Sequence, residues 1–343
     1  MNAVVKPAPG TASTVNLVVR DLSVHYRVPA WFGSRTVSAV DGVSLTIEPG
    51  RVVGLVGESG CGKSSIARAI VGLTEPSAGQ VLLGDTPLGR RRSREQRHAV
   101  QMIFQNPRAS LNPRRSVREA LAEALAVVGV EGPRRGQKLH DLLDSVSLSD
   151  ELLDRLPAQL SGGQCQRVAI ARALALKPRF LLADEATAAL DATVAAGTVA
   201  LFRTLADEYD LGVLLITHDL HTVEWIADEV AVMYLGRLVE QGTVDTVLER
   251  PLHPYTACLL DARPSLRPRG PRRFELRGEV IDSAPGGCQF APRCPVATEI
   301  CHLDRPVLTQ GGHRLACHHP LDPVRPVDPE PKENDAHRVP RPA

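Results

Sequence analysis

The N-terminal part of the chain alternates apolar and polar positions, and a short continuous apolar run follows. Residues 16–27 and 43–48 show the alternation that is typical of half-buried strands. Residues 51–57 form an apolar run that ends in glycine, and the pattern over 63–71 is helical. The pattern therefore predicts a strand, a glycine-rich loop and a helix, in that order.

Two further apolar runs, at 180–184 and 212–217, end in or precede an acidic residue or a histidine. Such runs are typical of buried parallel strands, whose carboxyl ends carry the chemistry of open α/β sheets. Helical patterns cover 116–130, 137–146 and the stretch from the turn at 161–163 to residue 176. We therefore predict an α/β core with a helical insertion.

Composition and charge narrow the class of protein. The net charge of +1 over 343 residues gives no general electrostatic reason for a nucleic-acid partner, and the basic run 90–97 is interpreted as a solvated loop. No run approaches the roughly 18 apolar residues of a transmembrane helix, and residues 1–15 lack the apolar core of a signal peptide. We expect a cytosolic chain whose seven cysteines serve metal binding or burial rather than disulfides.

Residues 57–64 fit the P-loop pattern Gly-x4-Gly-Lys-Ser. Glycines let backbone N–H groups approach phosphate oxygens, and the following helix presents its N-terminus to the anion. Lys63 would reach the β- and γ-phosphates of ATP, and the Ser64 hydroxyl would bind Mg²⁺. The expected phosphate-binding residues are Gly57, Glu58, Ser59, Gly60, Cys61, Gly62, Lys63, Ser64 and Ser65. Kinases, GTPases, helicases and transporter ATPases share this loop, and a glycine-rich turn that binds nothing is the alternative.

The run 180–184 ends in Asp184, and Glu185 follows. An aspartate at a strand end beside the P-loop can hold Mg²⁺, and the adjacent glutamate can polarise the water that attacks the γ-phosphate. Capping of the next turn is the alternative for this pair. The segment Leu-Ser-Gly-Gly-Gln at 160–164 predicts a second anion-binding helix N-terminus. A second cradle indicates a second protein face that clamps the nucleotide.

At this point the chain resembles the ABC ATPases over residues 16–260, because Leu-Ser-Gly-Gly-Gln is the signature motif of that family. The resemblance implies that two such domains pair head to tail, with each ATP between one P-loop and the partner's signature. The signature residues here are Ser161, Gly162, Gly163 and Gln164. The departures from the family pattern are Ala186, Ala188 and Cys165, and none removes a group with a direct role in phosphoryl transfer.

The resemblance also implies roles for four single residues. Tyr26 matches the aromatic residue that stacks on adenine, although a core position is the alternative. Gln105 resembles the Q-loop residue that senses Mg²⁺ and the γ-phosphate and couples to the membrane subunits. Asp191 matches the D-loop at the dimer interface, and His218 matches the switch histidine that contacts the γ-phosphate. The implied catalytic set is Glu185, His218 and Lys63, and the implied Mg²⁺ ligands are Ser64, Gln105 and Asp184.

The segments 109–113, 251–256 and 287–318 resemble the oligopeptide and dipeptide importers within this family. The resemblance implies peptide import at the cytoplasmic face of the membrane, with ATP and Mg²⁺ as cofactors. Its implied partners are two transmembrane permeases, a second ATPase subunit and, indirectly, an extracytoplasmic solute-binding protein, with no nucleic acid. Uptake of nickel or oligosaccharides, a soluble ABC ATPase outside transport, and a regulatory binder that does not hydrolyse ATP are the alternatives.

Four cysteines in the C-terminal segment, Cys288, Cys294, Cys301 and Cys317, lack the Cys-x2-Cys pairs of structural zinc sites. The family resemblance supports a 4Fe–4S cluster. Zinc, with a nearby histidine as a substitute ligand, and free thiols are the alternatives.

The expected fold is an α/β P-loop NTPase of the ABC type, with an N-terminal antiparallel β subdomain, a helical signature subdomain and a Cys-rich extension. The domains are a flexible N-terminus at 1–15, the ATPase domain at 16–265 with its helical subdomain at about 106–175, the extension at 266–319, and a disordered Pro-rich tail at 320–343.

Overall fold

The computed structural model describes residues 15–29, 33–188, 190–262 and 286–321. The predicted flexible N-terminus and Pro-rich tail therefore lie almost wholly outside the described residues. The first part of the extension, 266–285, lies outside them as well.

An antiparallel sheet forms from the N-terminal segment. β1 (Leu17–Pro29) pairs with β2 (Ser34–Ile47) on one side and with β4 (Ala78–Leu83) on the other, and β5 (Thr86–Pro87) lies at the edge. The strands predicted over 16–27 and 43–48 are confirmed, and the second is the end of the longer β2. Bulges between Val19 and His25 shift the pairing of β1 with β2.

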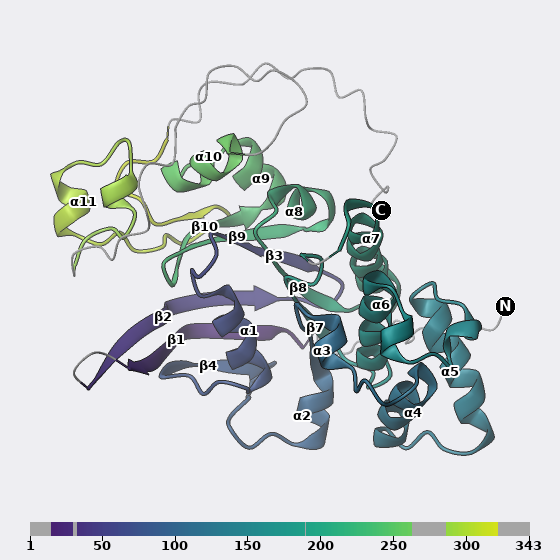
Figure 1. Cartoon of the computed structure of the whole chain (residues 1–343). Coiled ribbons are helices and arrows are strands. Elements are labelled where there is room, and N and C mark those ends of the chain that lie inside the picture. The colour runs from purple at the N-terminus through teal and green to yellow at the C-terminus, as the bar shows by residue number, and fades with distance from the viewer. Residues whose placement is uncertain (1–14, 30–32, 189, 263–285, 322–343) are drawn as a thin grey trace.

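A seven-stranded mixed sheet follows, in the order β11-β10-β9-β3-β8-β7-β6 (Figure 1). Its parallel strands are β3 (Val52–Val56), β6 (Val100–Ile103), β7 (Phe180–Asp184), β8 (Gly212–Thr217) and β9 (Glu229–Tyr234). The antiparallel strands are β10 (Arg237–Thr243) and β11 (Arg314–Leu315). The strands predicted at 180–184 and 212–217 are confirmed with their bounds.

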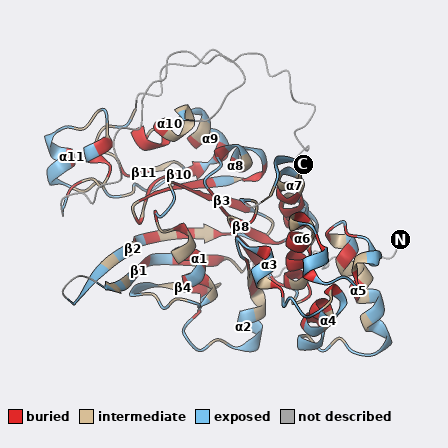
Figure 2. Cartoon of the chain, in the orientation of Figure 1, coloured by how far each residue is buried: buried red, intermediate tan, exposed pale blue. Residues whose placement is uncertain are grey.

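The mixed sheet buries both of its faces, so two hydrophobic cores form. On β3, Val53 and Leu55 pack with α1 (Lys63–Val71) and the antiparallel sheet, whereas Val52 and Val56 pack with helices on the opposite face. The helices of that second face are α7 (Ala192–Tyr209), α8 (Leu220–Ile226), α9 (Val244–Glu249) and α10 (Pro254–Asp261). Figure 2 shows strands of the mixed sheet, such as β3 and β8, as buried between the elements that cover them. Continuous apolar strands are expected where both faces are covered.

A group of helices is inserted between β6 and β7. It contains α3 (Pro107–Ser110), α4 (Val117–Val127), α5 (Pro133–Ser145), α6 (Gly162–Leu174) and the short 3₁₀ turns η1 (Asp150–Leu152) and η2 (Pro157–Gln159). Ser116 and Ser161 begin α4 and α6 through capping boxes. The helix predicted at 137–146 begins earlier, at Pro133, because proline is compatible with the first position of a helix.

The interpretation of 90–97 as a solvated loop is wrong in part. α2 (Arg94–Ala99) begins inside the run, and Arg92 donates hydrogen bonds to the carbonyl oxygens of Ile70 (2.6 Å) and Ala69 (3.3 Å). Burial lowers the pKa of Arg92. A cation at the last carbonyls of α1 is favourable because the C-terminus of a helix carries partial negative charge.

The described part of the extension contains a 3₁₀ turn, η3 (Ala291–Arg293), α11 (Glu299–Leu303) and β11. β11 adds to the mixed sheet beside β10. Glu240 of β10 is fully buried and accepts hydrogen bonds from His313 Nε2 (2.7 Å) and from the backbone N–H groups of Leu252 and His253. The extension therefore packs on the core through a shared sheet and a buried carboxylate.

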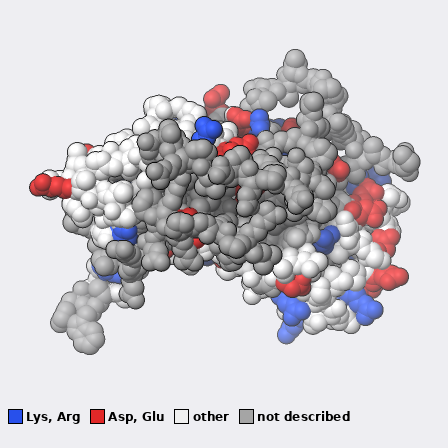
Figure 3. Space-filling model, turned by 90° about the horizontal axis from the view of Figure 1, so that it is seen from above, with Lys and Arg blue, Asp and Glu red and all other residues white. Residues whose placement is uncertain are grey.

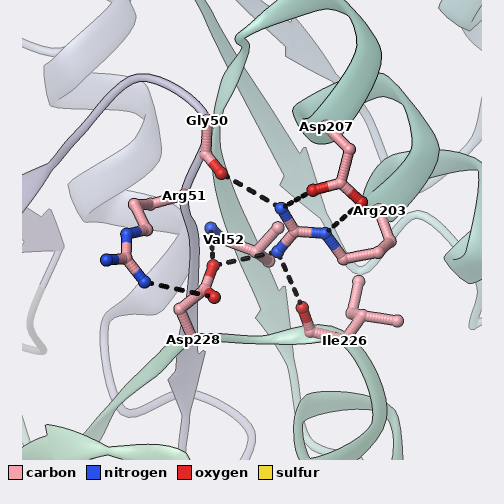
Figure 4. A network of polar contacts seen from close by, with 7 residues as sticks. All are labelled: Gly50, Arg51, Val52, Arg203, Asp207, Ile226 and Asp228. Carbon is pink, nitrogen blue, oxygen red and sulfur yellow. Dashed lines mark hydrogen bonds and ion pairs between the residues drawn. The ribbon is translucent and has the colours of Figure 1, made fainter. Parts of the chain in front are cut away.

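A polar network at the amino ends of the parallel strands joins three elements (Figure 4). Arg203 of α7 donates to Asp228 Oδ2 at 2.9 Å and to the Gly50 carbonyl at 3.0 Å, and it also pairs with Asp207. Asp228 in turn accepts from the Val52 N–H at 2.8 Å. The network therefore connects α7 with the starts of β3 and β9, at the end of the sheet opposite the P-loop.

Arg203→Met should lower the stability of the fold by about 3 kcal/mol. It removes the closer cation of Asp228, whose side chain is only 12% exposed, and leaves it the exposed Arg51 at 3.5 Å. The urea midpoint for unfolding of the purified chain measures the effect. Arg118→Met is the matched control, because Arg118 pairs with Asp154 on an exposed surface and should move the midpoint little. Equal shifts in the two variants would contradict the assigned importance of the network.

Candidate functional site

The P-loop runs from the end of β3 to the start of α1 and passes close to both sheets. A Cβ atom at position 57 would lie 2.2 Å from the Met233 carbonyl oxygen, and one at position 62 would lie 2.0 Å from the Ala39 carbonyl oxygen. Both residues have positive φ, +155° at Gly57 and +106° at Gly62. Only glycine meets both requirements. Ser59 and Gly60 are exposed at the tip of the loop.

Lys63 lies across the loop that precedes it. Its ammonium donates to the carbonyl oxygens of Gly57 and Glu58, each at 2.8 Å, and the side chain is buried. Cys61 Sγ lies 3.6 Å from the same ammonium, and burial raises the pKa of this thiol. The lysine is therefore placed by the backbone of the loop itself.

Ser64 and Asp184 meet beside this loop. The Ser64 hydroxyl donates to Asp184 Oδ1 at 2.8 Å, which joins the start of α1 to the end of β7. Burial raises the pKa of Asp184, and the hydrogen bond from Ser64 opposes that rise. A buried carboxylate beside a hydroxyl is the type of oxygen donor set that Mg²⁺ prefers.

Glu185 connects three segments. Its Oε2 accepts a hydrogen bond from Gln105 Nε2 at 2.8 Å, and its Oε1 lies 3.8 Å from His218 Nδ1. Its φ of +45° is unfavourable for a residue with a side chain. A backbone hydrogen bond to the Ile216 carbonyl (2.9 Å) holds this conformation. Strained backbone of this kind is typical of functional positions.

Tyr26 reaches the same region from β1. Its hydroxyl lies 3.3 Å from the Ser65 hydroxyl, and its ring is half-buried against the core between the two sheets. The structure therefore brings together Tyr26, Lys63, Ser64, Ser65, Gln105, Asp184, Glu185 and His218.

The signature residues form a separate group at the junction of α6 and α7. The Ser161 hydroxyl accepts from the Gln164 N–H, and the Gln164 side chain accepts from the Ser161 N–H. A Cβ at Gly163 would lie 2.2 Å from Val194 Cγ1, and Asp191 caps α7 by accepting from the Val194 N–H. Within the described ranges, no hydrogen bond joins this group to the P-loop. The replaced positions Cys165 and Ala186 are buried, and Ala188 is exposed.

The four predicted cysteine ligands line one small cavity. Cys288, Cys294, Cys301 and Cys317 share it with His253, His318 and His319, and its volume is about 10 Å³. Burial raises the pKa of Cys288, raises that of Cys294 to about 11 and raises that of Cys317 to about 12. Among the residues that the structure describes, no three His, Cys, Asp or Glu side chains form a group that could hold a metal ion.

Sequence reasoning missed two residues that touch the P-loop. The Glu58 N–H donates to the Tyr255 hydroxyl at 2.9 Å, and Arg293 pairs with the Glu58 carboxylate. Both contacts come from segments whose family resemblance was clear, 251–256 and 287–318. The resemblance marked these segments without indicating which residue reaches the loop.

None of the helices in the described ranges is long and apolar enough to cross a membrane. A family model described as ABC transporter matches residues 40–188. A second, described as oligopeptide/dipeptide transporter, C-terminal region, matches residues 239–301.

Two curated relatives cover most of the chain. The di/tripeptide transport ATP-binding protein DppF of Pseudomonas aeruginosa is 41% identical over 88% of this chain and 97% of its own length. The oligopeptide transport ATP-binding protein OppF of Salmonella typhimurium is 42% identical over 92% of this chain and 97% of its own.

The solved structures include the ATP-binding cassette MJ0796, seen as a dimer in a post-hydrolysis state with ADP and phosphate. It matches with a TM-score of 0.60 and 27% identity, and it covers 66% of this chain and 98% of its own. The P-loop, the segment 160–164 and the acidic end of β7 all lie within residues 40–188, which the ABC transporter model matches. The chain belongs to the ABC transporter family, among the ATP-binding proteins of oligopeptide and dipeptide transport.

Proposed function

We propose that this chain hydrolyses ATP to drive the import of short peptides, as a peripheral subunit on the cytoplasmic face of the membrane. The observation that carries the proposal is the convergence of Gln105, Asp184, Glu185 and His218 beside the P-loop. The peptide substrate is supported by the relatives, whose names are those of di/tripeptide and oligopeptide transport ATP-binding proteins.

In this proposal Lys63 and His218 neutralise charge on the γ-phosphate, and Glu185 orients and polarises the attacking water. Ser64, Asp184 and Gln105 would hold Mg²⁺, which when bound supplies positive charge against the phosphate oxygens. The donor set fits a hard cation, because it consists of a hydroxyl, a carboxylate and an amide. Tyr26 would stack on the adenine ring from β1.

Gln105 accounts for the coupling between chemistry and movement. It bonds directly to Glu185, and the next segment leads into α3 and the inserted helices. A shift of those helices therefore changes which group Gln105 contacts. When the two ATPase subunits close around ATP, the inserted helices would move between two positions, and Gln105 would transmit that movement.

A second ATPase subunit follows from the separation of the signature group from the P-loop. The N-terminus of α6, with Ser161, Gly162, Gly163 and Gln164, would complete the nucleotide site of the partner, and Asp191 would lie at the same interface. The dimeric state of the similar cassette supports this arrangement. The partner would be a different ATPase subunit, as a heterodimer.

The permeases would dock in a groove beside the Q-loop. The groove has a volume of about 340 Å³ and is lined by residues of β6, α4 and α6, including Met102, Phe104 and Val127. Phe104 is 40% exposed and Val127 is 39% exposed. Exposed apolar side chains in a concave surface favour a helix of a membrane subunit as the occupant. Two permeases and, through them, a solute-binding protein would complete the importer.

The described part of the face in Figure 3 gives no support to a nucleic-acid partner. On the part of the face shown in Figure 3 where residues are described, basic and acidic side chains lie side by side. Interspersed charges of both signs are typical of a solvated surface, whereas nucleic acids select basic patches.

For the cysteine cavity we propose a 4Fe–4S cluster held by Cys288, Cys294, Cys301 and Cys317. Four thiols on one cavity provide the required donor type, and a cluster uses one thiolate for each iron rather than grouping them on one ion. The cavity volume is about 10 Å³, so the thiols would have to rotate apart around the cluster. Burial raises the pKa values of Cys294 and Cys317, so these thiols would lose their protons when the cluster binds.

Glu185→Gln should reduce the rate of ATP hydrolysis by at least about 100-fold while ATP still binds, because the amide cannot polarise the water. Phosphate release and nucleotide binding are measured on the same preparation. Glu151→Gln, an exposed glutamate on η1, is the control and should hydrolyse at the normal rate. Normal hydrolysis by Glu185→Gln would refute the assigned role.

Short peptides should stimulate ATP hydrolysis by the transporter reconstituted with its permeases, partner ATPase and solute-binding protein. The assay compares a panel of peptides with nickel chelates and oligosaccharides, and the Glu185→Gln complex sets the background. Stimulation by chelates or oligosaccharides without any response to peptides would leave the ATPase in place and overturn the peptide substrate.

Protein purified without oxygen should carry iron and acid-labile sulfide, and Cys294→Ser should lose both. Cys165→Ser is the matched control, because Cys165 is buried between helices away from the cavity. Elemental analysis and visible absorbance provide the measurements. Zinc in place of iron, or iron that survives Cys294→Ser, would contradict the proposed cluster.

A further inference from the structure

The Cys-rich extension touches the P-loop directly. Arg293 donates to both carboxylate oxygens of Glu58, at 2.7 and 3.0 Å, across 235 positions of sequence. The Arg293 side chain is 6% exposed and that of Glu58 is 28% exposed. A bidentate pair with little access to water is one of the stronger polar contacts in a protein.

The extension holds Arg293 rigidly. Arg293 ends the 3₁₀ turn η3, between Cys288 and Cys294, and its guanidinium also donates to the Tyr234 hydroxyl at 3.3 Å. The same guanidinium lies 5.9 Å from the centre of the Tyr234 ring. Phe290, three residues earlier, packs against that ring with centroids 5.2 Å apart. The arginine is therefore pre-placed, and little side-chain freedom remains to be lost when it pairs.

On the other side of the contact, every polar group of residue 58 is held. Its carboxylate pairs with Arg293, its N–H donates to the Tyr255 hydroxyl, and its carbonyl accepts from Lys63. The Lys63 ammonium that donates to this carbonyl is the group assigned to the phosphates. The position of Glu58 thus affects both the backbone of the loop and the lysine that the loop orients.

Glu58 is also an acid inside a site for a polyanion. An ionised carboxylate beside bound phosphates repels them unless a cation neutralises it. Arg293 is the cation paired with Glu58, and hydrogen bonds to Glu58 raise the pKa of its guanidinium. The pairing therefore fixes the loop and removes an unfavourable charge from the nucleotide site.

We infer that Arg293 is a positioning residue for ATP binding, through which the Cys-rich extension sets the nucleotide affinity of the P-loop. The inference rests on the proposed ATPase function for its kinetic consequence, but its effect on nucleotide binding can be measured separately. It concerns Arg293 itself and holds whether the cysteines carry a cluster, zinc or protons.

Arg293→Gln should raise both the KM and the Kd for MgATP about tenfold, because it leaves Glu58 unpaired, while kcat changes less than twofold. The double variant Arg293→Gln with Glu58→Gln should recover most of this loss, because the repelling charge is gone. Arg293→Lys should recover part of it, since a lysine neutralises charge but cannot form the bidentate pair. Arg314→Gln is the control, because Arg314 belongs to the same extension and bonds to Gln241 instead.

ATPase kinetics of the reconstituted transporter and calorimetric MgATP binding by the full chain are measured together with the unfolding temperature. A lower unfolding temperature with unchanged Kd and KM would overturn the inference, because Arg293 would then serve only the packing of the extension. Failure of the double variant to recover affinity would also overturn it. If the wild type binds MgATP without hydrolysing it, the proposed function fails, and the Kd values alone decide the role of Arg293.

Discussion

The closeness of the P-loop backbone to both sheets is the constraint on which the rest of the site depends. Carbonyl oxygens of Met233 and Ala39 lie where side chains at positions 57 and 62 would have to be. Met233 belongs to the mixed sheet and Ala39 to the antiparallel sheet, so the loop fits only when the two sheets have this spacing. Once the loop is fixed there, Lys63 and Ser64 start α1 at a set distance from the end of β7. Tyr234, the residue after Met233, packs against Tyr255 and against Phe290 of the extension.

The two ends of the parallel strands serve different purposes. At the amino ends, Arg203 and Asp228 satisfy one another and the first backbone groups of the sheet, which stabilises the arrangement of α7, β3 and β9. At the carboxyl ends, Glu185 adopts a strained φ, and Asp184 has a raised pKa because it is buried. Both features cost free energy and persist only where the surrounding structure is well determined. The satisfied network stabilises the same sheet in which these two acids lie.

Much of this arrangement could be predicted from the sequence. β7, β8 and α1 have the predicted bounds, because continuous apolar runs and a helical pattern report burial on both faces of a sheet. The meeting of Asp184, Glu185 and His218 follows from the rule that parallel strands bring their carboxyl ends to one edge. The place of Gln105 beside them follows from the family resemblance. The pairs Arg293–Glu58 and His313–Glu240 could not be predicted, because contacts between single polar residues leave no periodic signal. For the same reason the sequence predicts a solvated Arg92, although its guanidinium binds the last carbonyl oxygens of α1.

The described part of the extension depends on these unpredicted contacts for its own order. Its described elements are short, five residues in α11 and two in β11, and elements of that length are not stable alone. They are ordered because β11 pairs with β10 and His313 binds the buried carboxylate of Glu240. Phe290 also packs against Tyr234, and Arg293 pairs with Glu58. A segment held by contacts with the nucleotide loop cannot change shape without changing those contacts. The described part of the extension is consequently coupled to the P-loop through the pair Arg293–Glu58, although more than 200 residues separate the two in the sequence.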